Sequence, residues 1–194
     1  MSANIQLIVG LGNPGPEYEY TRHNAGANFV EKLINANHAE FKLEKKFFGL
    51  YSKIRLADTD IHCLIPMTFM NRSGQAIAAV ARFYKIPVES ILVAHDELDI
   101  APGTARFKQG GGHGGHNGLR NTIDQLGSRD FARLRLGIGH PGIGRDVVGY
   151  VLKKAPKAER ELMTKAIDEA LSILPEAIIG NWNKAQTLMN GFKA

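Results

Sequence analysis

The chain has 194 residues, of which 44% are hydrophobic, and its 24 Lys and Arg against 19 Asp and Glu give a formal net charge of +5. A chain of this length and composition can bury about 70% of its unfolded surface, enough for one self-sufficient core. The single Cys63 excludes an internal disulfide framework, no zinc-finger spacing occurs, and no apolar run approaches the roughly 18 residues of a membrane span. We therefore expect an untargeted, soluble, cytoplasmic protein without a membrane partner.

The first half of the chain alternates predicted strands with predicted helices. A strand at 5–9 ends at a glycine-proline cluster, and a helix over 24–37 follows, with apolar residues at helical spacing. Then come two strands around an Asp-Thr-Asp turn, a helix and a short buried strand, at residues 48–56, 61–65, 73–84 and 91–94.

The second half continues the alternation. It contains a strand, a glycine loop, a helix and another strand, at residues 104–108, 110–115, 117–126 and 134–138. An amphipathic helix over 157–174 meets Pro175, which we expect to end or kink it, before a last helix near 183–189. The pattern predicts one α/β domain over residues 1–194, with a mixed sheet between two layers of helices.

Charge and glycine are both concentrated in residues 104–145. This stretch holds seven basic and two acidic residues, so it carries the whole net charge, and it holds 11 of the 21 glycines. Its interspersed apolar residues argue against a flexible tail. We expect a shaped basic surface for an anionic partner.

The segment from Gly10 to Gly15 matches the dinucleotide fingerprint G-x-G-x-x-G after a strand, so a nicotinamide-dependent oxidoreductase has to be considered. A pyrophosphate site needs a helix that starts at the third glycine. Here Pro14 and Pro16 flank Gly15, and the predicted helix begins some eight residues later. The sequence favours a rigid loop that positions Asn13.

Two polar clusters are placed near the carboxyl ends of predicted strands, where open α/β sheets carry their active crevice. They are Tyr18, Arg22, His23 and Asn24 after the first loop, and His95, Asp96, Glu97 and Asp99 after the strand at 91–94. A His beside a carboxylate is a general base with its orienting partner, although each cluster alone also suits loop capping. Asn13, Asn71 and Asn117 fall on predicted loops, where amides bind carbonyls or an oxyanion or simply form turns.

Other catalytic signals are weak. The sequence lacks P-loop, zincin and serine-hydrolase motifs. His113 and His116 suggest a metal site, but the glycines between them disfavour a helical pair, and no carboxylate lies close in sequence. We predict no metal and no cofactor.

Taken together, the motifs resemble the bacterial-type peptidyl-tRNA hydrolases. The resemblance rests on six blocks in the family's order across essentially the whole chain: Val9-Gly-Leu-Gly-Asn-Pro-Gly15, Thr21-Arg-His-Asn-Ala-Gly26, Pro66-Met-Thr-Phe-Met-Asn-Arg-Ser-Gly74, Val93-Ala-His-Asp-Glu-Leu-Asp99, Gly110-Gly-Gly-His-Gly-Gly-His-Asn-Gly118 and Arg133-Leu-Arg-Leu-Gly-Ile-Gly-His-Pro141. The one departure we note is Met67, where the family more often has another residue. Each block is weak alone, and six in register are specific.

The resemblance implies a monomeric, cytoplasmic, cofactor-free esterase that releases tRNA from peptidyl-tRNA for reuse in translation. His23 resembles the general base, Asp96 the carboxylate that stabilises its basic form, and Asn13 the residue that separates blocked substrate from free aminoacyl-tRNA. The positions that match substrate contacts are Tyr18, Phe69, Asn71 and Asn117, with Met70 and His116 beside them. Those that match tRNA phosphate contacts are Arg106, Lys108 and Arg135.

Two further expectations concern the substrate. We expect the site to disfavour a free α-ammonium group, because it provides no carboxylate to bind one. We also expect Arg133 to face the tRNA with the other basic residues. Phosphate contacts do not read sequence, so broad tolerance of tRNA species is predicted. A non-catalytic RNA-binding module remains the alternative from another class.

Overall fold

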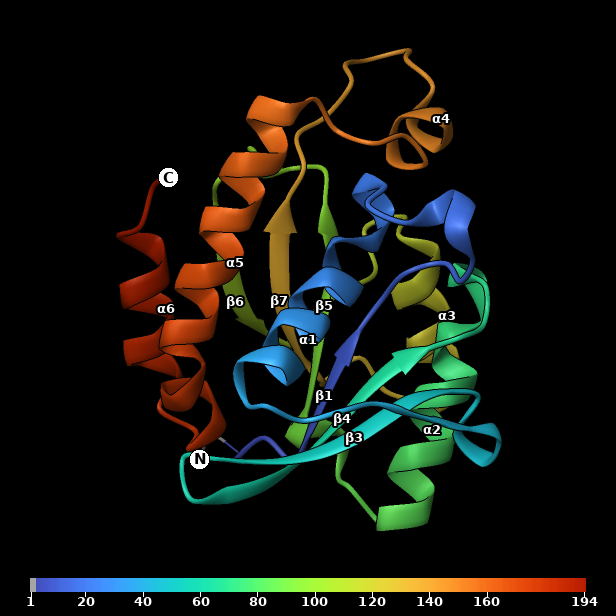
Figure 1. Cartoon of the computed structure of the whole chain (residues 1–194), viewed down its shortest axis with the longest axis vertical. Coiled ribbons are helices and arrows are strands. Elements are labelled where there is room, and N and C mark those ends of the chain that lie inside the picture. The colour runs from blue at the N-terminus through green and yellow to red at the C-terminus, as the bar shows by residue number, and fades with distance from the viewer. Residues whose placement is uncertain (1–2) are drawn as a thin grey trace.

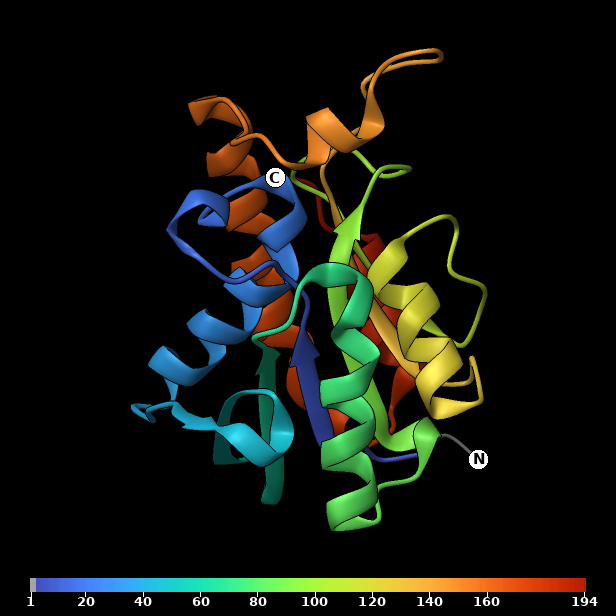
Figure 2. The ribbon, with the colours of Figure 1, turned by 90° about the vertical axis from the view of Figure 1, so that its right-hand side faces the viewer.

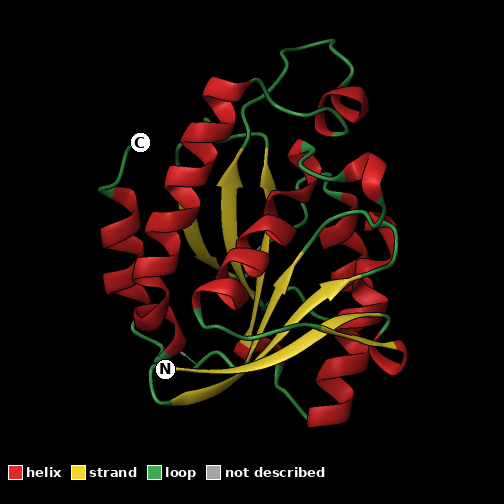
Figure 3. Cartoon of the chain, viewed as in Figure 1, coloured by secondary structure: helices red, strands yellow, loops and turns green. Residues whose placement is uncertain are grey.

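The computed structural model describes residues 3–194 and contains a seven-stranded mixed sheet in the order β2-β3-β4-β1-β5-β7-β6 (Figure 1, Figure 3). The strands are β1 Leu7–Gly10, β2 Lys42–Glu44, β3 Gly49–Leu56, β4 Thr59–Pro66, β5 Ile91–Glu97, β6 Ala105–Gln109 and β7 Ala132–Gly137. The helices are α1 Ala25–Ala36, α2 Ser73–Tyr84, α3 Asn117–Leu126, α4 Val147–Val151, α5 Lys157–Ile178 and α6 Trp182–Asn190. The predicted α/β class is confirmed.

Helices cover both faces of the sheet, which confirms the three-layer arrangement. Figure 2 shows α1 and α5 on one side of the sheet and α2 and α3 on the other. Side chains alternate along each strand, so in β1 Ile8 packs under α1 while Leu7 and Val9 pack under α2. Each fully buried aliphatic side chain contributes roughly 1.5–3 kcal/mol, and the two apolar clusters hold the layers together.

Four adjacent strands place their carboxyl ends at one edge. β1 pairs in parallel with β4 and β5, and β5 pairs in parallel with β7, whereas β2, β3 and β6 run antiparallel to their neighbours. The loops that follow β1, β4 and β5 therefore meet at the same edge of the sheet.

Two glycines let α1 approach this edge closely. A Cβ on Gly26 would lie 2.1 Å from the carbonyl oxygen of Ala94 in β5, and a Cβ on Gly10 would lie 2.3 Å from the carbonyl oxygen of Gly26. Any side chain at either position would push the start of α1 away from the strands. The close contact brings the residues just before α1 against the end of β5.

The dinucleotide interpretation fails in the structure. Gly15, with a φ of 109°, precedes only a three-residue 3-10 helix, Pro16–Tyr18, and α1 begins at Ala25. The third glycine therefore faces no long helix whose free N–H groups could bind a pyrophosphate.

Most predicted elements are present, with three corrections. β5 continues three residues beyond its apolar run, because its backbone keeps pairing with β7 as far as Glu97, so His95 and Asp96 lie within the strand. Pro175 does not end α5, which runs to Ile178 because Ala177 and Ile178 are fully buried in the core. The short elements β2 and α4 were not predicted. No helix in the described residues is long and apolar enough to cross a membrane.

Candidate functional site

A pocket of about 720 Å³ lies at the edge where the parallel strands end. One wall comes from the loops after β1 and β4, another from β6, β7 and the glycine loop, and a third from α4. Residues from these walls include Asn13, His23, Phe69, Asn71, Asp96, Lys108, His116, Asn117, Arg135 and Val148. Both polar clusters of the sequence contribute to it.

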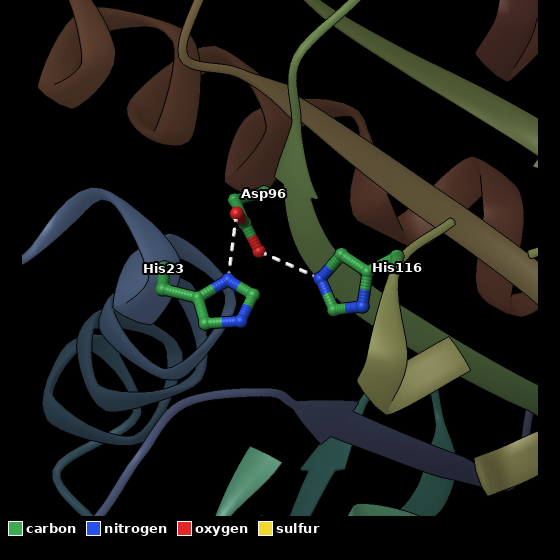
Figure 4. A group of neighbouring side chains, drawn as sticks. All are labelled: His23, Asp96 and His116. Atoms are coloured by element: carbon green, nitrogen blue, oxygen red, sulfur yellow. Dashed lines mark hydrogen bonds and ion pairs between the residues drawn. The ribbon is translucent and has the colours of Figure 1, made fainter. Parts of the chain in front are cut away.

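Two histidines bind the two oxygens of one buried carboxylate (Figure 4). The Nδ1 atom of His23 lies 2.8 Å from Oδ2 of Asp96, and the Nε2 atom of His116 lies 2.7 Å from Oδ1. The Asp96 side chain is 3% exposed. Since an ionised carboxylate only accepts, both ring nitrogens donate to it, and in the neutral form of His23 the nitrogen without a proton is Nε2.

The tautomer of His116 is fixed by the backbone. His116 is the N-cap residue of α3, and its Nδ1 accepts the N–H groups of Gly118 and Leu119 at 3.1 and 3.3 Å. A nitrogen that accepts backbone N–H groups carries no proton, so the remaining ring proton is on Nε2 and points to Asp96. His116 therefore acts as a neutral donor that holds Asp96 in place.

Asp96 is held in its charged form. Burial by itself raises the pKa of this carboxyl, but the electrostatic interactions and hydrogen bonds with His116 and His23 outweigh burial and bring the pKa below its ordinary range. The arrangement supplies a negative charge beside His23 at neutral pH.

Asn13 is held by three hydrogen bonds. Its backbone N–H donates to Oδ1 of Asn24 and its carbonyl accepts from Nδ2 of the same residue, at 2.8 and 3.0 Å. Its side-chain oxygen accepts the N–H of Met70 at 2.7 Å. With that oxygen engaged, the Asn13 amide presents N–H groups to the pocket that it lines.

Comparisons with known proteins show to which family the chain belongs. A model of the peptidyl-tRNA hydrolase family matches residues 7–194. The curated peptidyl-tRNA hydrolase of Pseudomonas syringae pv. syringae is 59% identical over 191 residues, which is 98% of each chain. The chain belongs to the peptidyl-tRNA hydrolase family. It is thus an enzyme of this type.

Other members of the family also match over nearly the whole chain. The peptidyl-tRNA hydrolase of Chromohalobacter salexigens is 53% identical over 193 residues, or 99% of this chain and 100% of that one. The crystal structure of the peptidyl-tRNA hydrolase from Acinetobacter baumannii has a TM-score of 0.95 at 50% identity, and the match covers 100% of this chain and 97% of that one.

The other residues that the family resemblance singles out lie in or beside the pocket. Phe69, Met70, Asn71 and Asn117 line it, and Met70 is buried with its sulfur against Gly118. Tyr18 does not line the pocket but packs edge-on against Phe69 at the rim, with ring centroids 6.3 Å apart. All five stay predicted substrate contacts of this hydrolase.

The basic residues form cross-strand pairs on the sheet face opposite α5 and α6. Arg106 faces Arg135, and Lys108 faces Arg133. Lys108 and Arg135 line the pocket, whereas Arg106 lies outside its lining. Arg135 donates from Nε to Glu97 at 2.9 Å, so part of its charge is already neutralised.

Arg133 corrects the sequence prediction. It is only 2% exposed, and its guanidinium donates to the carbonyl oxygens of Gly111 and Gly112 and to that of Arg129. It holds the glycine loop against the sheet instead of presenting its charge to a tRNA. The sequence does not reveal this role, because the carbonyl groups that bind Arg133 come together only when the glycine loop folds.

The expectation that the site lacks carboxylates is also wrong. Asp96, Glu97 and Asp99 all line the pocket. Asp96 is engaged by two histidines and Glu97 by Arg135, while Asp99 is exposed at the rim. Any discrimination against a free α-ammonium therefore has to come from the placement of the Asn amides and not from an absence of negative charge.

A metal does not fit the central cluster. Ligand atoms of His23, Asp96 and His116 lie within 4.8 Å of one another, as a three-ligand metal site requires. However, His116 Nε2 carries the ring proton because its Nδ1 accepts two backbone N–H groups. Binding a metal there would break the cap of α3, so we assign the cluster to hydrogen bonding.

Sequence reasoning missed three features of the site. They are the bond from His116 to Asp96, the fixation of Asn13 by Asn24, and the apolar wall formed by α4. Only the last had a local signal, since Asp146 precedes the apolar pair Val147–Val148 and caps α4 through the N–H of Gly149.

His95 is a buried titratable group next to the cluster. Its Nδ1 donates to the carbonyl oxygen of Asp96 at 2.8 Å, and its Nε2 has no hydrogen-bond partner among residues 3–194. Complete burial lowers the pKa of His95 to about 3. The unfolded chain therefore binds a proton at His95 between about pH 6.5 and 3, while the folded chain does not.

We expect His95→Asn to make folding less sensitive to acid. Wild-type stability should fall by about 1 kcal/mol more than that of the variant between pH 7.5 and 5.5, because only the wild type has to keep this imidazole neutral. Urea unfolding at both pH values measures the difference. Equal losses in the two proteins would show that His95 is protonated in the fold.

Proposed function

We propose that the chain hydrolyses the ester bond between the peptide carboxyl and the 3′-terminal ribose of tRNA, with a water molecule activated by His23. The observation that carries the proposal is the 2.8 Å contact between His23 Nδ1 and Asp96, which leaves the other ring nitrogen free to accept a proton within a pocket. A positioned base of this kind contributes about 10²–10⁴ in rate.

The steps balance with water as the only co-reactant. His23 Nε2 takes a proton as the water oxygen attacks the ester carbonyl carbon. The tetrahedral oxyanion then collapses, the bond to the ribose oxygen breaks, and the imidazolium returns the proton to that oxygen. The products are a free peptide carboxyl group and a tRNA with its terminal hydroxyl restored.

The neighbouring groups have separate roles in this scheme. Asp96 fixes the tautomer of His23 and stabilises its imidazolium, and His116 holds Asp96. The amides of Asn13, Asn71 and Asn117 line the pocket and supply uncharged donors for the oxyanion or the peptide, and one oxyanion donor is worth about 10²–10³ in rate. All these residues come from one chain, which supports a monomeric enzyme, and the lone Cys63 suits the reducing cytoplasm.

The direct test is release of tRNA from N-acetyl-aminoacyl-tRNA in a buffer that contains EDTA, with unblocked aminoacyl-tRNA as the comparison. We expect turnover of the blocked substrate and little of the unblocked one, with EDTA without effect. Saturable binding of the blocked substrate without release would instead indicate an RNA-binding module that lacks the chemistry.

Lys108 should contribute more to tRNA binding than Arg135. Within the described residues no carboxylate pairs with Lys108, whereas Arg135 is paired with Glu97. We expect Lys108→Ala to raise KM for a full-length tRNA substrate several-fold and to reduce the slope of log KM against log salt by about 1. Arg135→Ala should have a smaller effect, and Glu97→Gln should lower KM at low salt by freeing Arg135.

Kinetics at several salt concentrations check this order, with an esterified nucleotide as the minimal substrate. If Lys108→Ala impaired both substrates equally, the residue would act on the site's structure and not on tRNA.

A further inference from the structure

The helix α4 stands apart from the sheet (Figure 1, Figure 2). It nevertheless forms an apolar wall of the pocket. Val147, Val148, Val151 and Leu152 line the pocket from this side. We call residues 145–155 the cover segment. The loop that leads into it contains Gly139, Gly142 and Gly144 at positive φ. Because glycines restrict the backbone little, contacts with other parts of the chain have to hold the cover segment in place.

Most of these contacts involve Arg22, the residue before His23. The backbone N–H of Arg22 donates to the carbonyl of Lys153 at 3.0 Å, and Thr21 forms an isolated β-bridge with Lys154. The guanidinium lies 3.8 Å above the ring centroid of Tyr150. Its Nη1 also donates to the carbonyl oxygen of Tyr150 at 3.0 Å.

The Arg22 guanidinium is buried, and its contacts with Tyr150 explain why an arginine stands here. Arg22 is 7% exposed, Nη2 reaches Glu159 in α5 only at 3.4 Å, and Nε has no partner among the described residues. A buried charge that is incompletely paired lowers the stability of the fold. If the position only had to fill space, an apolar residue would give a more stable protein. Stacking on a ring combined with a directed bond requires the planar fork of arginine.

Tyr150 extends the connection to the sheet. Its hydroxyl donates to the carbonyl oxygen of Ile138, just after β7, at 2.7 Å. The cover segment is therefore held between the end of β7 and the turn that carries the base. Arg22, His23 and Asn24 are consecutive and contact the cover segment, Asp96 and Asn13 respectively.

We propose that Arg22 is a positioning residue that sets the distance between His23 and the apolar wall of α4, and thereby favours substrates whose acyl group carries an apolar side chain. This inference rests on the proposed ester hydrolysis. The basic residues lie on β6 and β7, so the tRNA end of the substrate is expected there. The acyl end is then left to face α4 across His23.

The test compares N-acetyl-leucyl and N-acetyl-glycyl esters of tRNA with Arg22→Lys, Tyr150→Leu and the control Arg160→Lys, which alters an exposed arginine of α5. We expect Arg22→Lys and Tyr150→Leu to raise KM for the leucyl substrate at least five-fold, with kcat within two-fold. The glycyl substrate should change less than two-fold, because glycine offers no side chain to the wall. Arg160→Lys should match the wild type.

Amide hydrogen exchange supplies a readout that does not depend on activity. Arg22→Lys should speed exchange in residues 147–153 and leave β5 and β7 protected. A fall in kcat with unchanged KM, equal losses on both substrates, or unchanged exchange of the cover segment would each overturn the inference. An inactive wild type would instead contradict the proposed function, and the exchange experiment would still decide whether Arg22 holds the cover segment.

Discussion

Replacement of His23 by alanine is expected to lower kcat for N-acetyl-aminoacyl-tRNA by about 10²- to 10⁴-fold, with little change in KM. The variant removes the nitrogen that accepts the proton of the attacking water, while the pocket walls that bind substrate are left in place. The residue lies in a 3-10 turn, Arg22–Asn24, whose neighbours hold it through their own bonds, so the fold should survive.

The measurement is single-turnover release of tRNA across a range of substrate concentrations. His38→Asn is the matched control, since His38 is exposed at the end of α1 and its positive φ of 53° suits asparagine. Retention of more than a tenth of the wild-type kcat by His23→Ala would exclude this residue as the base.

Replacement of Asp96 by asparagine should cost a comparable factor of about 10²–10⁴ in kcat. Asp96 accepts one hydrogen bond at each oxygen, from His23 and from His116. An amide has one accepting oxygen and one donating nitrogen, so it cannot accept from both rings. Since His116 is bound to the backbone in one tautomer, His23 is the ring expected to reverse, which would place its proton on Nε2 and abolish the base.

Stability should respond to the same substitution in a pH-dependent way. The pKa of Asp96 lies below its unfolded value, so its stabilising contribution is complete above about pH 4 and is lost as the pH falls further. The difference in unfolding free energy between the wild type and Asp96→Asn should therefore be constant near neutral pH and shrink in acid. Asp58→Asn, in the exposed turn between β3 and β4, provides the control.

Kinetics and urea unfolding at pH 7.5 separate the two effects. If Asp96→Asn stayed folded and kept its kcat within three-fold of the wild type, the carboxylate would have no part in orienting His23.

The sequence was most informative where a pattern is local. The bounds of α2 and α3 follow from apolar residues at helical spacing, and the structure has both helices at the predicted residues. The ends of β5 and α5 were misjudged because pairing with β7 extends the first, and burial of the last turn carries the second past Pro175. Local propensity is overridden in both places by contacts with distant segments.

The same difference between local patterns and long-range contacts applies to the site. By itself the sequence determined the α/β class, the basic stretch, the pairing hypothesis for His23 and Asp96, and, through six ordered blocks, the family. Only the tertiary structure decided that His116 holds the second oxygen of Asp96, that Arg133 supports the glycine loop, and that Arg22 binds Tyr150, 128 positions away. Such contacts leave no periodic signal, because each joins residues far apart in sequence that meet only when the loops close around the ends of the strands.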